Sequence, residues 1–150
     1  MRTCWTREDM ALLKTARAFD ELCGVAERVL ARMRDNLGHD IEMVCGPITT
    51  GGQGSPEENL IVLGRHIKRR QQAGKIVFVQ LLFEEALWRI RKNPLNSEDR
   101  LLNEFYLPLF EKGLIRRLVF VPNWETSNGA RWEHRQAERL GLQIEYDKPL

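Results

Sequence analysis

The sequence predicts a three-layer α/β domain built on a parallel sheet of four or five strands. Three observations support this prediction. Short apolar runs that are typical of strands alternate along the chain with segments that have the periodicity of helices. The runs at 75–83 and 117–123 are almost continuously apolar, as in strands covered on both faces. A length of 150 residues suits one domain with a real hydrophobic core.

The first helical segment is expected at residues 7–36. The motif TRED at 6–9 is typical of a capping box, which predicts a helix that begins with the second residue of the motif. Apolar positions between Leu12 and Leu37 alternate steps of four and three residues, which is a heptad pattern. Gly24 could divide the segment into two shorter helices.

The apolar stripe of this segment must be covered by another apolar surface. A second copy of the segment is one cover, since the sheet is expected to be flanked by its own crossover helices. The sequence therefore predicts a homodimer or a larger homo-oligomer. The alternative is a monomer in which the segment lies across its own domain.

The remaining elements alternate between strands and helices, which implies right-handed crossovers. The run at 41–46 is typical of a short strand, and a glycine-rich loop follows it. Ser55 as N-cap, Pro56 at the first helical position and Glu58 three residues after the cap then predict a helix that Gly74 ends. Further helices are expected at 84–92, at 97–106 with a kink or break at Pro108, and at 128–140, and further strands at 75–83, 117–123 and 143–146.

The composition argues against several classes of protein. A net charge of +2 results from 23 basic and 21 acidic residues that are mixed along the chain, so neither a nucleic-acid nor a membrane partner is expected. No apolar run has the length of a membrane span or of a signal-peptide core, and we expect a cytoplasmic protein. Cys4, Cys23 and Cys45 lack CxxC spacing and the histidines are scattered, so no disulfide framework, metal site or cofactor is expected.

The glycine-rich loop after the strand at 41–46 is the first candidate site. Ligands of open parallel sheets bind at the carboxyl ends of the strands, where loops lead into helix N-termini. The glycines of VCGPITTGGQGS, at 44–55, let backbone N–H groups approach an anion, and the threonine hydroxyls can bind it. A phosphate or a sugar hydroxyl would fit such a loop. The alternative is a mobile surface loop.

Glu133 is the second candidate, because it lies among apolar residues on the helix expected at 128–140. At about 100° per residue it shares a stripe with Ala130 and Ala137, while Arg131 falls on the opposite side. A buried carboxylate needs a partner, a proton or a polar cavity. In a polar cavity near a helix N-terminus it stays ionised and can attack a sugar carbon. The alternative is a structural glutamate that pairs with an arginine or caps a backbone group.

Two motifs resemble those of the nucleoside 2-deoxyribosyltransferase superfamily. They are VCGPITTGG at 44–52 and WETSNGARWEHRQAERLGL at 124–142. The superfamily includes the 2'-deoxynucleoside 5'-monophosphate N-glycosidases, and the likeness is greatest to a related bacterial and phage domain family of unknown function. The resemblance covers about residues 41–146. It implies a nucleoside deoxyribosyltransferase-like domain of flavodoxin-like strand order at 41–150, and the helical extension at 1–40 lies outside it. It also implies oligomers that complete the active site with a neighbour's residues.

The resemblance also implies roles for individual residues. Glu133 matches the glutamate that attacks the anomeric carbon and forms a glycosyl-enzyme intermediate. Ser127 stands where the N-glycosidases have a serine that meets the phosphate, which favours a nucleotide over a nucleoside as ligand. The substrate-binding residues implied by the two motifs are Gly46, Pro47, Ile48, Gly51, Gly52, Ser127, Asn128 and Gly129.

Active members of the superfamily also carry an aspartate that positions or protonates the base. The corresponding stretch here is LLNEFYLP, in which Asn103 and Glu104 are the candidates. Glu104 could act as the acid, since a carboxyl group of raised pKa has that role in other enzymes. The expected protein thus binds a nucleotide and has the chemistry of a nucleotide N-glycosidase or deoxyribosyltransferase. The alternative is a catalytically silent nucleotide or nucleotide-sugar sensor, or an interaction module.

Overall fold

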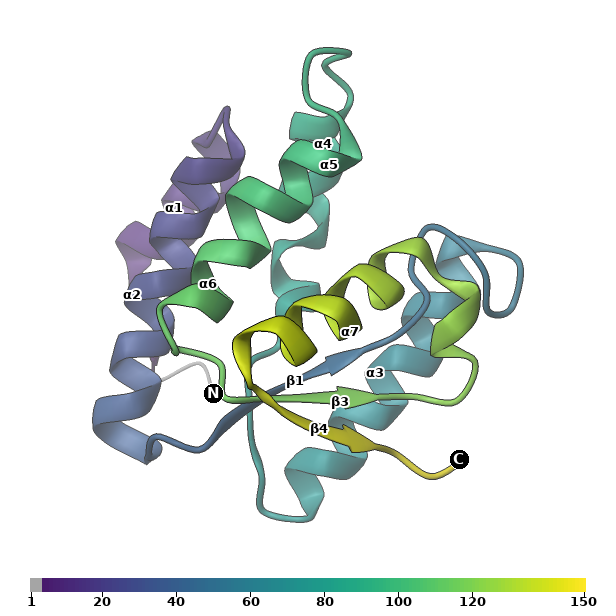
Figure 1. The fold of residues 1–150 in the computed structure, drawn as a ribbon. Helices are drawn as coiled ribbons and strands as arrows, with labels where there is room; N and C mark the ends of the chain where they lie inside the picture. Colours follow the sequence, from purple (N-terminus) through teal and green to yellow (C-terminus); the bar gives the residue numbers. More distant parts are fainter. Residues whose placement is uncertain (1–3) are drawn as a thin grey trace. The chain divides into compact units, whose positions relative to one another are not determined.

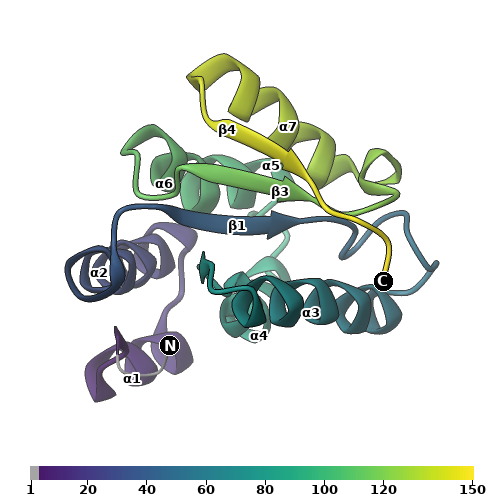
Figure 2. The ribbon, with the colours of Figure 1, turned by 90° about the horizontal axis from the view of Figure 1, so that it is seen from below.

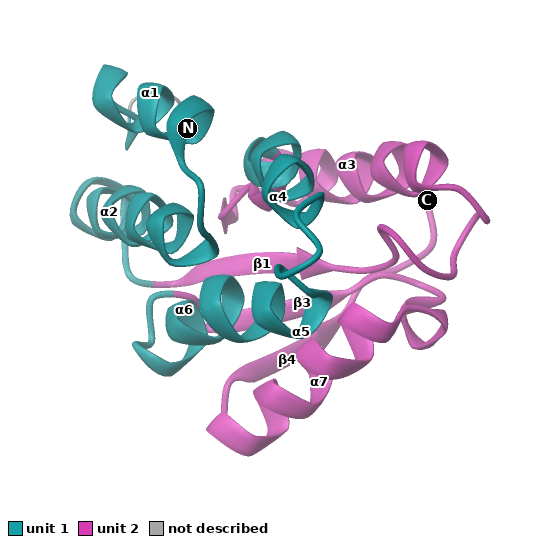
Figure 3. Cartoon of the chain, turned by 90° about the horizontal axis from the view of Figure 1, so that it is seen from above, with its two compact units in different colours: residues 1–39, 82–114 teal, residues 40–81, 115–150 magenta. Residues whose placement is uncertain are grey.

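The computed structural model describes residues 4–150, and the chain divides into two compact units (Figure 3). Unit 1 comprises Met1–His39 and Leu82–Leu114, and unit 2 comprises Asp40–Leu81 and Ile115–Leu150. Each unit is therefore assembled from two stretches that are separated in the sequence. No helix within residues 4–150 has the length and apolar character needed to cross a membrane.

Unit 2 contains a sheet of four parallel strands (Figure 1). The strands are β1 (Ile41–Cys45), β2 (Ile76–Val77), β3 (Arg117–Phe120) and β4 (Gln143–Tyr146), and they lie in the order β2-β1-β3-β4. The predicted α/β class and the parallel sheet are confirmed. The strand order is that of a flavodoxin-like fold.

Helices α3 (Pro56–Gln72) and α7 (Asn128–Leu140) cover opposite faces of this sheet (Figure 2), which gives unit 2 three layers. Both helices begin where the sequence predicts them. The hydroxyls of Ser55 and Ser127 cap them, each accepting at 3.2 Å a hydrogen bond from the backbone N–H three residues later. The core between α3 and the sheet consists of Val44, Leu63, Ile67, Val77, Val119 and Val121.

The strand predicted at 75–83 is much shorter in the structure. Only Ile76–Val77 forms β2, and from Gln80 the chain makes a 3-10 turn, η2 (Gln80–Phe83). The buried side chain of Gln80 donates through Nε2 to the carbonyl oxygen of Val44 at 2.5 Å, so a side chain replaces a backbone partner at this position. An apolar run indicates burial, and burial occurs in strands and in irregular segments alike.

The single helix considered for residues 7–36 is two helices, α1 (Arg7–Thr15) and α2 (Phe19–Leu37). The predicted capping box is present at the start of α1. The break between the helices begins at Ala16, where the backbone becomes extended. Gly24, which the sequence offers as one possible point of division, lies inside α2.

Contacts with distant residues set the position of this break. Arg89, on α4 (Glu84–Arg91), donates through Nη2 to two carbonyl oxygens at the end of α1, at 3.0 and 2.7 Å. Asp9 of α1 is buried and forms an ion pair with Arg32 of α2 at 2.6 Å. The arginine side chain satisfies carbonyl groups that a longer helix would have used, and the ion pair holds α1 against α2.

The apolar stripe of α2 is covered within its own chain. Phe19 and Leu30 are 1% and 0% exposed. Helix α2 contacts α4, the π-helical turn η3 (Leu102–Tyr106) and α6 (Leu107–Glu111), all in unit 1. This stripe therefore does not require a second copy of the chain. A homo-oligomer stays a prediction, and it would need a different interface.

The helix predicted at 97–106 continues past its expected end. It starts as α5 (Glu98–Leu101), passes through the π-helical turn η3 and leads into α6, where Pro108 lies in the first turn. Proline lacks an N–H and clashes with the carbonyl group one turn earlier in a regular α-helix. The wider π-turn directly before Pro108 accommodates the proline without ending the helical segment.

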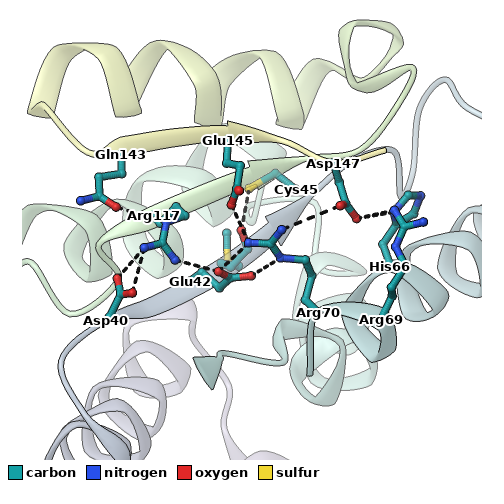
Figure 4. A network of polar contacts seen from close by, with 11 residues as sticks. Asp40, Glu42, Cys45, His66, Arg69, Arg70, Arg117, Gln143, Glu145 and Asp147 are labelled. Carbon is teal, nitrogen blue, oxygen red and sulfur yellow. Dashed lines mark hydrogen bonds and ion pairs between the residues drawn. The ribbon is translucent and has the colours of Figure 1, made fainter. Parts of the chain in front are cut away.

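A buried carboxylate connects the strands of unit 2 (Figure 4). Glu42 of β1 is 0% exposed, and it accepts hydrogen bonds from Arg70 Nε at 2.6 Å and from Arg117 Nη1 at 2.8 Å. Arg70, on α3, also pairs with Glu145 of β4 at 2.5 Å. Arg117, on β3, also pairs with Asp40 at 2.7 Å. One carboxylate and its two arginines thus join β1, β3, β4 and α3.

We expect the substitution Arg70→Gln to lower the free energy of unfolding by about 3 kcal/mol, because it removes one of the two arginines of a buried carboxylate. Chemical denaturation at pH 7 measures this change. The matched control is Arg65→Gln, an exposed arginine on the same helix, for which we expect a change below about 0.5 kcal/mol. Equal losses in the two variants would mean that the Glu42 network does not stabilise unit 2.

Candidate functional site

The two strand–helix junctions expected to form a site lie side by side at the carboxyl edge of the sheet. The loop at 46–54 follows β1, and the short turn η4 (Trp124–Thr126) follows β3 and leads into α7. The N–H of Gly52 donates to Thr126 Oγ1 at 2.8 Å, and the N–H of Asn128 donates to Thr50 Oγ1 at 3.0 Å. The two hydrogen bonds close the loop onto the start of α7.

Asn59, in the first turns of α3, fixes the shape of the loop. Its side chain is buried, and Nδ2 donates to the carbonyl oxygens of Ile48 and Gly51 at 3.0 and 3.1 Å. Its Oδ1 accepts from the N–H of Gln53 at 2.8 Å. This role could not be predicted from the sequence, because an asparagine inside a helix gives no sign that it binds the backbone of a neighbouring loop.

Steric crowding within the fold explains why three positions of the loop are glycines. A Cβ atom at Gly51 would lie 2.2 Å from the carbonyl oxygen of Thr126, and the φ angle of Gly51 is +69°. Gly52 has a φ of +64°, and its Cβ would lie 2.5 Å from Asn59 Oδ1. At Gly46 a Cβ would lie 2.4 Å from a methyl group of Val121. These three glycines therefore let the loop pack closely, whatever ligand it binds.

A small cavity lies under the loop. Pro47, Asn59 and Pro122 are among its lining residues, and its volume is about 20 Å³. This is room for about one water molecule. A ligand of nucleotide size therefore cannot occupy this cavity unless the loop opens.

Glu133 is buried on the face of α7 that covers the sheet, as the helical periodicity predicts, with 8% of the residue exposed. Its carboxylate lies close enough to the thiol of Cys45, the last residue of β1, to affect the ionisation of that thiol. Burial, and next the negative charge of Glu133, raise the pKa of this thiol well above its usual value. The thiol is therefore neutral at neutral pH, and its Sγ atom lies 3.8 Å from the carbonyl oxygen of Met43, to which it donates. Gly46, the first residue of the loop, directly follows Cys45.

The start of α7 contains the other residues of the second motif. Ser127 is buried, and its hydroxyl accepts from the N–H of Ala130. The side chain of Asn128 accepts a hydrogen bond from Arg131. At Gly129 the nearest atom to a Cβ would be 3.9 Å away, an ordinary contact distance, so packing does not require a glycine there. The close approach of a ligand to the helix N-terminus would explain why residue 129 is a glycine.

Glu104 belongs to unit 1, whereas Glu133, the loop and the start of α7 belong to unit 2. Its carboxylate accepts from Arg100 Nε at 2.6 Å, four residues earlier on the same helical segment. The neighbouring Asn103 donates to a backbone carbonyl oxygen of that segment at 2.8 Å. Both residues that are candidates for the place of the family's aspartate, of which only Glu104 can act as an acid, therefore have partners inside unit 1.

Glu84, at the start of α4 in unit 1, is a carboxyl group whose pKa is shifted toward neutral pH. Burial raises its pKa to about 7, and the charge of Arg91 only partly opposes this effect. A carboxyl group that binds a proton near neutral pH is a candidate acid or base. Its sequence context gave no signal, because the loss of hydration depends on tertiary packing.

Comparisons with protein-family models, curated proteins and solved structures give no match to this chain. The resemblance to the nucleoside 2-deoxyribosyltransferase superfamily therefore stays a prediction that rests on the two motifs. Among residues 4–150, no three His, Cys, Asp or Glu side chains are grouped in a way that could hold a metal ion.

We expect Gly51→Ala to destabilise the protein by about 2–4 kcal/mol, because left-handed backbone strain adds to a clash with the carbonyl group of Thr126. The matched control is Gly54→Ala. Gly54 also has a positive φ, +93°, but has no atom within 4 Å of a Cβ, so only strain of about 1–2 kcal/mol is expected. Thermal and chemical denaturation of both variants measure the difference. Equal effects would mean that the loop is not packed against η4.

Proposed function

We propose that the protein binds nucleotides at the carboxyl edge of its sheet and cleaves their N-glycosidic bond with Glu133 as the nucleophile. The buried carboxylate of Glu133 carries this proposal. It lies beside Cys45, the last residue of β1, and Cys45 directly precedes the glycine-rich loop. Ligands of open parallel sheets bind at this kind of position.

The surroundings of Glu133 suit a nucleophile. A thiol is a weak hydrogen-bond donor, so the neutral Cys45 beside the carboxylate withdraws little of its electron density. Burial reduces the shell of water that otherwise stabilises a carboxylate and slows its attack. Both conditions favour attack on an electrophilic carbon that binds close to Glu133.

The proposed reaction has two steps. An oxygen of Glu133 forms a bond to C1' of the sugar while the bond from C1' to the base nitrogen breaks, and the base takes the bonding electrons and a proton from solvent water. Water, or the N–H nitrogen of a second base, then attacks C1' and releases a proton to solvent, and the ester bond to Glu133 breaks. The carboxylate is restored, and the product is a free sugar phosphate or a new nucleotide.

The start of α7 favours a phosphorylated substrate. The hydroxyl of Ser127 uses one acceptor position for the N–H of Ala130, and its donor can still bind a phosphate oxygen. The positive end of the α7 dipole favours an anion, and Gly129 has no side chain that would block its approach. A nucleoside monophosphate satisfies these groups better than a nucleoside.

A catalytically silent nucleotide sensor is the second candidate. The closed loop favours it, because the N–H groups of Gly52 and Asn128 are already bound by threonine hydroxyls and the cavity under the loop has a volume of only about 20 Å³. A sensor would bind a nucleotide and leave its N-glycosidic bond intact.

Release of free base from a panel of ribo- and deoxyribonucleoside 5'-monophosphates, followed by chromatography, tests the proposed reaction. We expect Glu133→Gln to reduce the rate about a thousandfold or more, because the amide has nearly the same shape but is a poor nucleophile. Glu138→Gln, which removes an exposed carboxylate of the same helix, is the matched control and should keep the wild-type rate.

Thermal denaturation of both variants verifies that the fold is intact. Base release that survives in the Glu133→Gln variant would show that Glu133 is a structural residue. Saturable nucleotide binding by the wild-type protein without any base release would favour the sensor.

A further inference from the structure

A second cavity lies in unit 1, beside the break between α1 and α2. It is open on one side and has a volume of about 510 Å³, within the range of roughly 300–1,000 Å³ that is typical of small-molecule sites. Residues 14–17 line it from the break, and Arg89, Ile90, Asn93 and Asn96 line it from α4 and the turn that follows.

The charged side chains that line this cavity are all cationic. Lys14, Arg17 and Arg89 contribute three cationic side chains, and no carboxylate is among the lining residues. Within residues 4–150, none of the three cations forms an ion pair with a carboxylate. The nearby carboxylate of Glu21 accepts from the backbone N–H of Arg17 at 3.4 Å. The cavity therefore concentrates positive charge on a protein whose net charge is only +2.

Arg89 is held in position for a ligand. Its Nη2 group donates to the carbonyl oxygens of Leu13 and Ala16 at 3.0 and 2.7 Å, which fixes the plane of the guanidinium. These bonds also cover carbonyl groups whose negative ends would otherwise repel an anion. The Nε and Nη1 groups of Arg89 remain as donors, and a guanidinium presents such donors in a fork that matches a phosphate.

The turn after α4 adds a neutral donor. The Oδ1 atom of Asn93 accepts from the N–H of Leu95 at 3.0 Å, which orients the amide and leaves its NH₂ group for a ligand. Asn96 is fixed by its bond from Nδ2 to the carbonyl oxygen of Ile90 at 3.0 Å. The site thus has an ordered wall, and binding an anion there requires little additional ordering of side chains.

We propose that this cavity is a binding site for a small phosphate-bearing molecule. Two exposed cations, Lys14 and Arg17, and one arginine held by two hydrogen bonds suit a compact group with more than one negative charge. The site lies in unit 1 and does not include Glu133, so it is independent of the proposed N-glycosidase reaction.

Titration of the ¹⁵N-labelled full chain with inorganic pyrophosphate, followed by two-dimensional NMR, tests the proposal. We expect saturable shifts at residues 14–17 and 89–96. The double variant Lys14→Gln/Arg17→Gln should weaken binding about tenfold or more, because two charge-assisted contacts are lost. The matched control, Arg65→Gln/Lys68→Gln, removes the same charge from exposed positions on α3 and should change the Kd by less than about twofold.

Three results would overturn the proposal. They are shifts that do not saturate, shifts confined to unit 2, and equal weakening by both double variants, which would indicate general attraction of the anion to the protein. Pyrophosphate binding that is unchanged in the Glu133→Gln variant supports a site separate from the proposed active site. This outcome does not depend on whether base release is observed.

Discussion

The buried carboxylate of Glu42 is the constraint on which the arrangement of unit 2 depends. A fully buried charge without partners is very costly, so Arg70 and Arg117 must be present beside it. These two arginines come from α3 and β3, and they also reach Glu145 of β4 and Asp40. The sheet order and the position of α3 are thereby coupled to one ion-pair network.

Glu42 and Arg117 lie near the beginning of β1 and β3, and the candidate site lies at the carboxyl ends of these two strands. Fixing the register of β1 against β3 also fixes where the loop at 46–54 and η4 leave the sheet. Asn59 and the loop glycines then close the loop onto the start of α7. A rigid sheet edge with a loop held by a few hydrogen bonds is a common basis for ligand binding, because the loop can open while the sheet does not move.

The sequence could predict features that depend on local patterns. The inward position of Glu133 follows from its helical spacing to Ala130 and Ala137, and the starts of α3 and α7 follow from the serine caps. The proximity of the two junctions follows from the parallel sheet, since carboxyl ends of parallel strands meet at one edge.

Features that depend on distant partners could not be predicted in the same way. The break after α1 requires Arg89, a residue more than 70 positions away, and the burial of Glu42 requires arginines from two other elements. The short β2 was missed because an apolar run does not distinguish a strand from a buried turn. The raised pKa of Glu84 has the same origin, because burial by tertiary packing causes it.

We propose that the Glu133 carboxylate forms a covalent bond with a sugar. Intact-protein mass spectrometry after incubation with a 2'-fluorinated nucleoside 5'-monophosphate tests it most directly, because the fluorine slows both steps and lets the intermediate accumulate. We expect a mass increase equal to one fluorinated sugar phosphate, located at Glu133 by peptide mapping and absent from the Glu133→Gln variant. An unmodified protein mass, or a label on another residue, would contradict it.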